Sequence, residues 1–358
     1  AYIKHESGKK FADFKKTNLH VVGYSKPINK ILSKKDLINK IHTQKDQPNS
    51  IPYVTSYYKE NWGFCMTEKQ KKKLPDGKYK VLIDSSLKKG KLEINHAVIK
   101  GKNKKEIFFS SYICHPSMAN NELSGPVLIN AIMLYLKKKY PKPKYSYRFV
   151  LLPETIGSIA YISKFKKVLK KNVVCGFNLT CVGDERRYTL TKTPSGNTIA
   201  DHSLNAAVIG LKKVKKHSFL KSKSDERQYC SPGINLPVCA FSKSKEYPEY
   251  HTDKDDFKVV TQKGLDDSLG VMKAIIDAFE LGIYPKSSFF CEPNLGKRNL
   301  YPTISQKGNY SKQLRLRKNL ISYSDGQNNI FQIANIMNVP LKTICEQYKL
   351  LKAKKILR

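Results

Sequence analysis

Residues 106–138 read EIFFSSYICHPSMANNELSGPVLINAIMLYLKK, and this stretch decides the fold. It opens with the apolar run EIFFSSYIC, passes through a polar segment that ends in Ser124-Gly125, and closes with apolar residues at helical spacing. A continuous apolar run is typical of a strand that is covered on both faces, as in a parallel sheet. The stretch therefore predicts a buried strand, a polar loop and a covering helix, in that order.

The same alternation of apolar strands and helices continues to Gly282. Strands are predicted at 145–153, 172–183 and 236–242, and helices at 157–165, 202–213 and 264–282. Alternating elements of this kind indicate an α/β fold with a doubly wound, mostly parallel sheet. We expect this α/β domain to span residues 101–290.

Residues 1–100 have a different character and predict a β-rich module. Short stretches of alternating apolar and polar residues, separated by turn signals, predict strands at 18–25, 51–58, 62–66, 78–87 and 91–101. One helix is predicted near 34–44. We expect an antiparallel module, inserted in or placed over the α/β domain, that covers the mouth of its pocket. Because residue 1 begins in mid-pattern, a preceding segment is also expected.

Residues 291–358 predict a separate winged-helix-like domain. The segments FQIANIMN and LKTICEQYKLLKAK are two short helices joined through Val339-Pro340, which is the spacing of a helix-turn-helix. Such a domain would contact nucleic acid or a protein partner. The alternative is a helical cap that packs on the main sheet or on a second copy of the chain, which leaves a homo-oligomer open.

Composition bounds the class of protein. The 358 residues include 66 Lys and Arg against 29 Asp and Glu, a formal net charge of +37, but the lysines are spread along the chain. This spread favours a solvated surface over a dedicated nucleic-acid arm. No apolar run approaches the roughly 20 residues that span a bilayer. The eight scattered cysteines and the absence of a signal-peptide pattern at the first residues predict a reduced, cytoplasmic protein.

Four polar clusters follow or precede the predicted strands. They contain His115 with Asn121 and Glu122; Glu154; Asp225 with Glu226 and Arg227; and Tyr250 with His251. In an open α/β sheet, ligands collect at the carboxyl ends of the strands, so we expect these clusters to meet there. Imidazoles, carboxylates and an arginine together are what a hydrolytic metal site needs.

The order of these clusters resembles the zinc aminopeptidases typified by bacterial leucyl aminopeptidase. The matching motifs lie between 107 and 282: His115, the stretch ANNELSG at 119–125, Glu154-Thr155-Ile156-Gly157, Asn178-Leu179-Thr180 and Tyr250-His251-Thr252. With the winged-helix tail, the chain is more narrowly similar to bacterial aminopeptidase-like proteins of unassigned activity, often encoded near polysaccharide-biosynthesis genes. The resemblance implies a zinc-exopeptidase fold and a small-molecule or peptide substrate.

The same resemblance implies roles for single residues and shows where this sequence departs from the family. His115 and His251 match the two metal-binding imidazoles, and Glu154 matches the general base. Asn121 stands where the family has the aspartate that bridges two zinc ions, and Thr155 and Thr180 replace two further carboxylate ligands. Ser117 also replaces the aspartate that orients the first histidine. A normal dinuclear site would therefore lack the anionic ligands that neutralise two dications.

Two hypotheses follow. In the first, His115 and His251 hold one zinc ion with a carboxylate from Glu122, Asp225 or Glu226, and the protein is a mononuclear metal-dependent peptidase or amidohydrolase. In the second, no metal binds and the pocket belongs to a non-catalytic binding or regulatory protein.

The remaining residues of the clusters have roles under both hypotheses. In the enzyme, Glu154 activates water and Arg227 polarises a carbonyl or binds a substrate carboxylate, while Asn121, Glu226 and Tyr250 contact the substrate. In the binding protein, Arg227 and Glu226 pair with each other and the other polar groups are hydrogen-bond partners.

Overall fold

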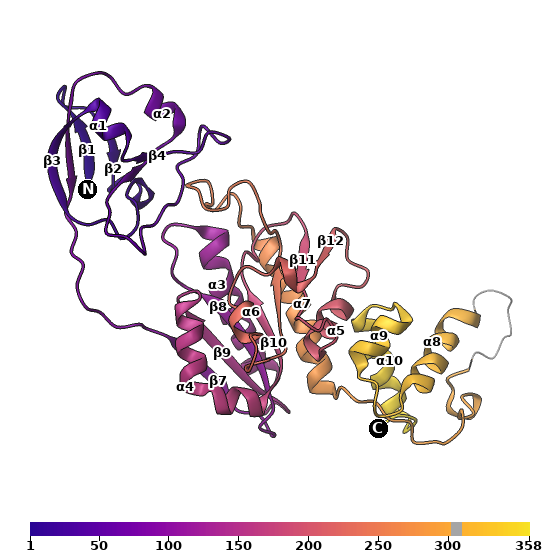
Figure 1. Ribbon diagram of the computed structural model, residues 1–358. Helices are drawn as coiled ribbons and strands as arrows, with labels where there is room; N and C mark the ends of the chain where they lie inside the picture. The colour runs from indigo at the N-terminus through magenta and orange to yellow at the C-terminus, as the bar shows by residue number, and fades with distance from the viewer. Residues whose placement is uncertain (302–309) are drawn as a thin grey trace.

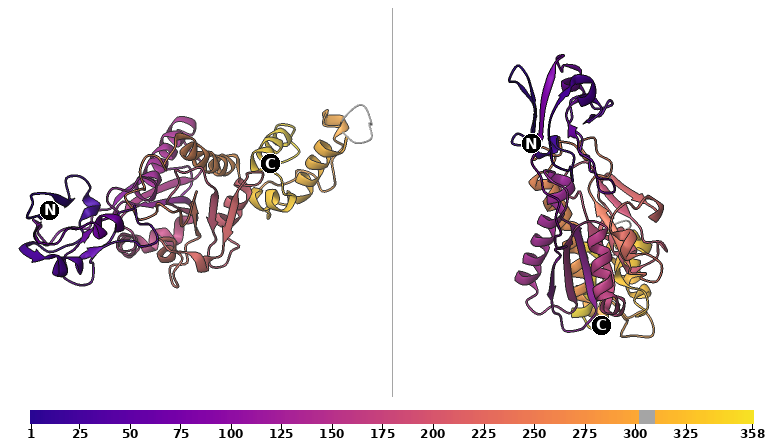
Figure 2. Two further views of the ribbon diagram at one scale, coloured as in Figure 1. Left: turned by 90° about the horizontal axis from the view of Figure 1, so that it is seen from above. Right: turned by 60° about the vertical axis from the view of Figure 1, so that its left-hand side comes forward.

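The computed structural model describes residues 1–301 and 310–358 as three groups of elements that follow one another along the chain. The N-terminal unit and the C-terminal helices lie at opposite ends of a central α/β unit, so the molecule is elongated (Figures 1 and 2). Within the described part of the chain, every helix is too short or too polar to cross a bilayer.

The central unit contains a seven-stranded sheet with the strand order β12-β11-β13-β10-β8-β9-β7. The neighbours β13, β10, β8 and β9 are parallel, whereas β7 and β11 run antiparallel to β9 and β13. The predicted α/β fold with a mostly parallel sheet is thereby confirmed. The strands are β7 (Asn95–Ile99), β8 (Glu106–Tyr112), β9 (Ser146–Leu152), β10 (Val173–Leu179), β11 (Tyr188–Thr191), β12 (Val214–His217) and β13 (Val238–Ser242).

Helices cover both faces of this sheet, as a doubly wound fold requires. Successive residues of β8 point to opposite faces, so Phe109 packs with α3 (Ser124–Lys139), α5 (Ile199–Ala207) and α7 (Gln262–Leu281). Its neighbour Phe108 packs in a second cluster with α4 (Ile156–Asn172) and α6 (Glu226–Tyr229). Both faces of the central strands are therefore covered, and groups that reach solvent lie at the edges of the sheet and in the loops at the strand ends.

The N-terminal unit is a small antiparallel sheet with the order β2-β1-β6-β3. Its elements are β1 (Tyr2–His5), β2 (Lys10–Asp13), β3 (Ile28–Ser33), α1 (Lys34–Ile38), α2 (Glu68–Lys72) and β6 (Lys78–Ile83), with a short parallel pair β4 (Ile41–His42) and β5 (Phe64–Cys65). The antiparallel arrangement matches the prediction, whereas the second helix was not expected.

Three segments of this region differ from the prediction. Residues 18–25 form a 3₁₀ turn (Asn18–His20) and isolated bridges, and residues 51–58 also make only isolated bridges. The strand predicted at 91–101 forms β7, which pairs with β9 of the central sheet and not with the N-terminal sheet. Alternation of apolar and polar residues reports one covered face, but it does not report which sheet covers it.

The loops also contain short turns of helix. These are a π-helical turn between β8 and α3 (Ala119–Leu123) and 3₁₀ turns at Phe219–Lys221 and Gly296–Arg298.

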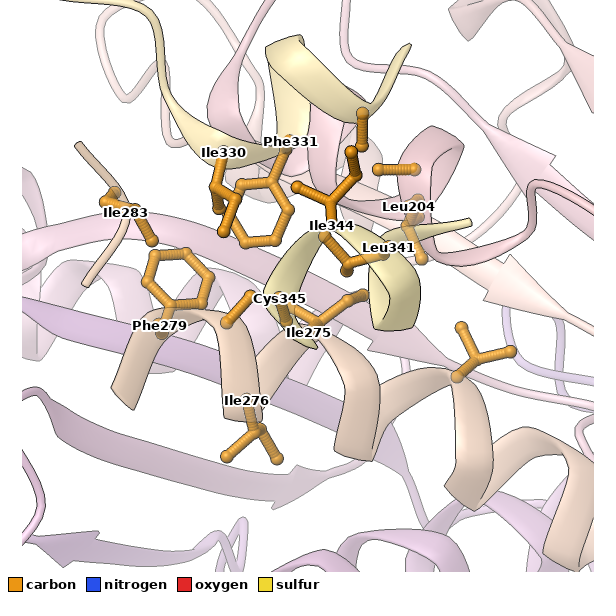
Figure 3. Close-up of a cluster of buried hydrophobic side chains, with 14 of the residues drawn as sticks. Leu204, Ile275, Ile276, Phe279, Ile283, Ile330, Phe331, Leu341, Ile344 and Cys345 are labelled. Carbon is orange, nitrogen blue, oxygen red and sulfur yellow. The ribbon is translucent and has the colours of Figure 1, made fainter. Parts of the chain in front are cut away.

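The C-terminal part contains α8 (Tyr310–Tyr323), α9 (Ile330–Met337) and α10 (Leu341–Ala353). The two predicted helices match α9 and α10, whereas α8 was not predicted. Ile330, Phe331 and Ile344 from these helices share one apolar cluster with Ile275 and Phe279 of α7 (Figure 3). Helices α9 and α10 therefore pack directly on the α/β unit.

We expect Phe279→Ala to destabilise the protein by about 3–5 kcal/mol, because it leaves a cavity between α7 and the C-terminal helices. Phe279 is fully buried, whereas Ile336 on α9 is 52% exposed. Ile336→Ala is the matched control and should change the free energy of unfolding by no more than about 0.5 kcal/mol. Urea unfolding followed by circular dichroism measures both values. Equal costs for the two variants would show that the cluster does not hold these helices.

Candidate functional site

The four polar clusters meet at the carboxyl ends of β8, β9, β10 and β13. His115, after β8, lies with its ring centre 5.2 Å from that of His251. Its Nε2 atom is 3.9 Å from Oε2 of Glu154, which follows β9. Glu154 in turn accepts a hydrogen bond of 2.5 Å from the hydroxyl of Ser224, in the segment before α6. Residues far apart in the sequence thus form one continuous polar site.

His115 is oriented by the carboxylate of Glu122. Nδ1 of His115 donates to Oε2 of Glu122 at 3.0 Å, and Oε1 of Glu122 accepts from the backbone N–H of Cys114. Burial opposes the charged imidazole, but hydrogen bonds with Cys114 and Glu122 outweigh it and raise the pKa of His115 to about 10. Glu122 therefore orients the ring of His115, and Nε2 of His115 is left to face Glu154.

His251 is the opposite case, a buried imidazole that stays neutral. Burial, followed by the charge of His115, lowers the pKa of His251 to about 4. Its Nε2 atom is buried and has no hydrogen-bond partner among the described residues. The ring stacks on Tyr250 with centres 3.9 Å apart, so its direction is set by packing. A neutral, unpaired imidazole nitrogen is a ready metal ligand or hydrogen-bond acceptor.

Glu154 lies on a sharply turned strand end. The next residue, Thr155, has φ of +64°, and its backbone N–H donates to Oδ1 of Asp225 at 2.7 Å. Burial raises the pKa of Glu154 above its usual value, against the lowering effect of the hydrogen bond from Ser224. A carboxylate whose pKa moves toward neutrality suits a general base.

Asp225 and Glu226 are both buried, and both bind backbone groups. Oδ1 of Asp225 also accepts from the Ser158 hydroxyl at 2.8 Å, while its Oδ2 atom has no partner among the described residues. Oε2 of Glu226 accepts from Asn178 at 2.8 Å and its Oε1 from the N–H of Lys223 at 3.2 Å. Each carboxylate therefore holds a loop of the site in place.

Asn121 belongs to the π-helical turn, and the carboxylate of Asp255 fixes the backbone of this turn. The two oxygens of Asp255 accept from the backbone N–H groups of Asn120 and Asn121 at 2.7 and 2.9 Å. The side-chain amide of Asn121 donates to the Tyr112 hydroxyl at 2.7 Å, and its Oδ1 is buried without a partner among the described residues. An acceptor of this kind is suited to a donor on a ligand or to a cation.

The structure does not place Arg227 in the site. Its side chain is exposed, its guanidinium lies over the ring of Phe219 at 5.7 Å, and it donates to the carbonyl of Ser222 at 3.4 Å. This arrangement supports neither a role in polarising a carbonyl nor the predicted pairing with Glu226. Arg227 lies on the exposed side of the short helix α6, whereas Glu226 before it is buried.

A small cavity of about 80 Å³ adjoins Glu154 at the ends of β10 and β13. Tyr250 and Glu226 line it, and their contact with a substrate stays a prediction. The other lining residues are mostly hydroxyl-bearing or charged: Tyr112, Thr180, Thr191, Lys223, Ser224, Ser242, Ser244, Lys245 and Glu246, with Cys181 and Ala240.

Sequence reasoning missed two contacts of the site. Tyr53, from the N-terminal unit, packs its ring edge-on against His115 and His251, with centres 5.5 and 5.4 Å away. Ser224 was part of a recognised cluster but was not assigned the hydrogen bond to Glu154. The position of Ser224 beside Asp225 was a usable signal, whereas nothing in the segment 51–58 pointed to a histidine pair.

The donor set fits one metal ion better than two. Zinc in a catalytic site takes about three protein ligands and a water. Glu122 occupies Nδ1 of His115, so Nε2 of that ring remains for a metal ion. Nε2 of His251 is buried and has no hydrogen-bond partner among the described residues. Cys114 also has a donor close by, since its sulfur, a ring nitrogen of His115 and an oxygen of Glu122 lie within 4.8 Å of one another. The protonated His115 would release a proton when a cation binds.

In chelator-treated protein, Asp225 should make the wild type lose stability as the pH rises. Burial raises the pKa of Asp225 to about 7 from 3.8, so its contribution is fully present below pH 3.8 and lost as the pH approaches 7. Between pH 5 and 7 the wild type should lose about 2 kcal/mol more than Asp225→Asn. Urea unfolding at several pH values measures this, with Asp76→Asn at an exposed position as the control. Parallel profiles for wild type and Asp225→Asn would contradict the prediction.

Comparison with known proteins places this geometry in a family. A family described as a domain of unknown function (DUF4910) matches residues 4–282, and a winged helix-turn-helix family matches residues 283–358. A Clostridium acetobutylicum protein, named for polysaccharide biosynthesis and an aminopeptidase-like domain, is 39% identical over 341 residues, which are 93% of this chain and 77% of that protein.

Solved structures agree with this placement. A crystal structure described as a peptidase candidate from Clostridium acetobutylicum has a TM-score of 0.90 at 36% identity, covering 100% of this chain and 82% of that one. A zinc aminopeptidase from Bacillus subtilis has a TM-score of 0.57 at 13% identity, covering 77% and 80%, which shows a shared fold alone. The resemblance to aminopeptidase-like proteins and the C-terminal winged helix are confirmed, and the chain belongs to the DUF4910 family.

Proposed function

We propose that the protein is a hydrolase of amide or peptide bonds that depends on one metal ion. The observation that carries the proposal is the pair of imidazoles 5.2 Å apart, one with a buried, unpaired Nε2, beside the carboxylate of Glu154. His115 and His251 would hold the ion. Both oxygens of Glu122 are engaged and Oδ2 of Asp225 is unpaired, so Asp225 is the proposed third ligand. Among the described residues its donor atom and those of the two imidazoles do not all lie within 4.8 Å of one another, so a bound ion would have to draw them closer.

The residues around this pair have distinct tasks in such a reaction. A bound zinc ion would supply Lewis acidity for the substrate carbonyl and for a water molecule. Glu154, held by Ser224, accepts the proton of the attacking water and returns it to the leaving nitrogen. Glu122 holds the ring of His115, and Tyr250 holds that of His251. The Clostridium relative's name offers polysaccharide biosynthesis as a context for the reaction.

One observation favours a second candidate function, a binding protein without turnover. Asn121, Thr155 and Thr180 stand where the resembling zinc enzymes have carboxylates, so the site holds fewer negative charges for a cation. In that case the unpaired oxygens of Asn121 and Asp225 and the free nitrogen of His251 serve as hydrogen-bonding groups for a polar ligand.

For the C-terminal helices we propose a packing role before a nucleic-acid role. A DNA-reading helix-turn-helix uses the N-terminal end of its second helix. Here Pro340, at that end of α10, lies against Gly210 after α5, and the Asn335 amide donates to the carbonyl of His202 at 3.0 Å. The division into 1–100, 101–290 and 291–358, the cytoplasmic location and self-association stay proposals.

Metal content should be about one zinc ion per chain in protein purified without an affinity-metal step. His115→Ala and His251→Ala should each lose it, because each removes one of the two imidazole ligands. His217→Ala, on the edge strand β12, is the control and should keep it. Elemental mass spectrometry measures the stoichiometry, and a wild type free of metal after zinc addition would refute the proposal.

Glu154→Gln should lower kcat by about 10²–10⁴-fold on any peptide or amide that the wild type cleaves, because the amide cannot accept the proton of water. Its metal content should be unchanged. Glu185→Gln, an exposed glutamate outside the site, controls for the loss of charge. Steady-state kinetics with a panel of peptides and amides measures the effect, and full activity of Glu154→Gln would exclude it as the base.

A further inference from the structure

Tyr53 connects the N-terminal unit to the histidine pair. Its backbone N–H donates to the carbonyl of His251 at 2.9 Å. Two residues earlier, the backbone N–H of Ile51 donates to the carboxylate of Asp253 at 2.7 Å. The carbonyl of Ile51 accepts from the backbone N–H of Asp253 at 3.0 Å. The ring of Tyr53 contacts both imidazoles by its edge. A segment of the N-terminal unit is thereby fixed as one wall of the site.

On its other side, Tyr53 borders a second cavity, of about 490 Å³. Pro116, the residue after His115, borders it too, so the cavity begins at the histidine loop and extends over the N-terminal unit. Its walls are largely apolar, with Phe14, Leu19, Val22, Tyr24 and Leu87 among them. Tyr24, Phe14 and Leu87 are 59%, 50% and 56% exposed, which is costly unless something covers them.

The two cavities near the histidine pair differ in size and in the residues that line them. The cavity beside Glu154 is small and most of its lining residues carry hydroxyl or charged groups, whereas the one beside Tyr53 is about six times larger and most of its lining residues are apolar. A ligand that spans the site would place a small polar group in the first and a bulky apolar group in the second. Apolar area removed from water contributes roughly 25 cal/mol per Å², so the larger cavity would supply much of the binding energy.

We propose that the substrate is an amide that joins a small, hydroxyl-bearing group to a bulky apolar or aromatic group, and that Tyr53 positions the two histidines while forming part of the wall of the larger cavity. This proposal rests on the hydrolase function proposed above. It assigns the N-terminal unit a part in recognition, because most of the apolar cavity is built from its residues.

Binding of two amides with opposite direction tests the proposal without turnover. Serine 2-naphthylamide and N-(2-hydroxyethyl)-2-naphthamide carry both groups, and serinamide lacks the naphthyl ring. Naphthyl fluorescence and calorimetry would be recorded with chelated and with zinc-loaded wild type. At least one naphthyl amide should bind ten-fold or more tighter than serinamide. Equal affinity for serinamide and both naphthyl amides would overturn the proposal.

A blocking variant with a matched control locates the naphthyl group. Ser86→Trp places a large side chain at an exposed position that lines the apolar cavity, whereas Lys88→Trp adds the same side chain two residues further, outside the lining. Ser86→Trp should weaken naphthyl-amide binding ten-fold or more and leave serinamide binding unchanged, and Lys88→Trp should change neither. Equal effects of the two variants would refute the location.

Tyr53 variants separate positioning from simple contact. Tyr53→Ala should weaken both naphthyl-amide binding and zinc affinity, since it frees both imidazoles, whereas Tyr53→Phe keeps the ring and should preserve both. Unchanged zinc affinity in Tyr53→Ala would refute the positioning role. Naphthyl-amide binding without metal or turnover would refute the proposed hydrolase function and support the proposed recognition of an apolar group. Turnover that is insensitive to Ser86→Trp would support the hydrolase function and refute recognition by the apolar cavity.

Discussion

The covering of both faces of β8, β9 and β10 is the constraint on which the rest of the structure depends. Ile107, Phe108 and Phe109 are fully buried in consecutive positions, so these strands offer no face to solvent. Charged and hydrogen-bonding groups that must reach a ligand can then lie only where the strands end. His115, Glu154 and the residues around Asp225 come from separate strand ends, and the parallel order of the sheet brings those ends to one edge.

A strand end is a loop, and buried carboxylates hold these loops in place. Asp255 binds the N–H groups of Asn120 and Asn121, Asp225 binds that of Thr155, and Glu226 binds that of Lys223. A buried carboxylate without such partners would be costly, and a loop without them would leave its amides unpaired. Each carboxylate solves both problems at once. The positions of His115 and Glu154 thus depend on acidic residues that need not touch a substrate.

Most of the central α/β unit could be predicted from the sequence, and less of the N-terminal and C-terminal parts. The runs around Phe108, Phe149 and Phe177 predicted buried strands correctly, because a short, continuous apolar run between helices is long enough for a strand covered on both faces and too short for a covering helix. The strand near Val98 was assigned to the wrong sheet, since pairing depends on tertiary context. Helix α8 was missed because basic residues such as Arg315 and Arg317 interrupt its apolar pattern.

The candidate site shows the same division between local pattern and tertiary contact. The order of the motifs in the sequence predicted that His115, His251 and Glu154 lie in one site. The hydrogen bond between Glu122 and Nδ1 of His115 could be identified only from the structure. The predicted role of Arg227 is not supported, because a helix of one turn points successive residues in different directions. Tyr53 could not have been found, since it reaches the site only through the packing of a separate unit on the loop of His251.

Through that packing the N-terminal unit contributes directly to the geometry of the histidine pair. The link between residues 51–53 and 251–253 is formed by backbone hydrogen bonds and one part-buried carboxylate contact, which hold the two segments against each other. A displacement of residues 51–53 would therefore shift the carbonyl of His251 and the ring that lies against both imidazoles. A 1 Å shift of a catalytic group can cost about 10²-fold in rate, so under the proposed hydrolase function the packing of this unit would bear directly on turnover.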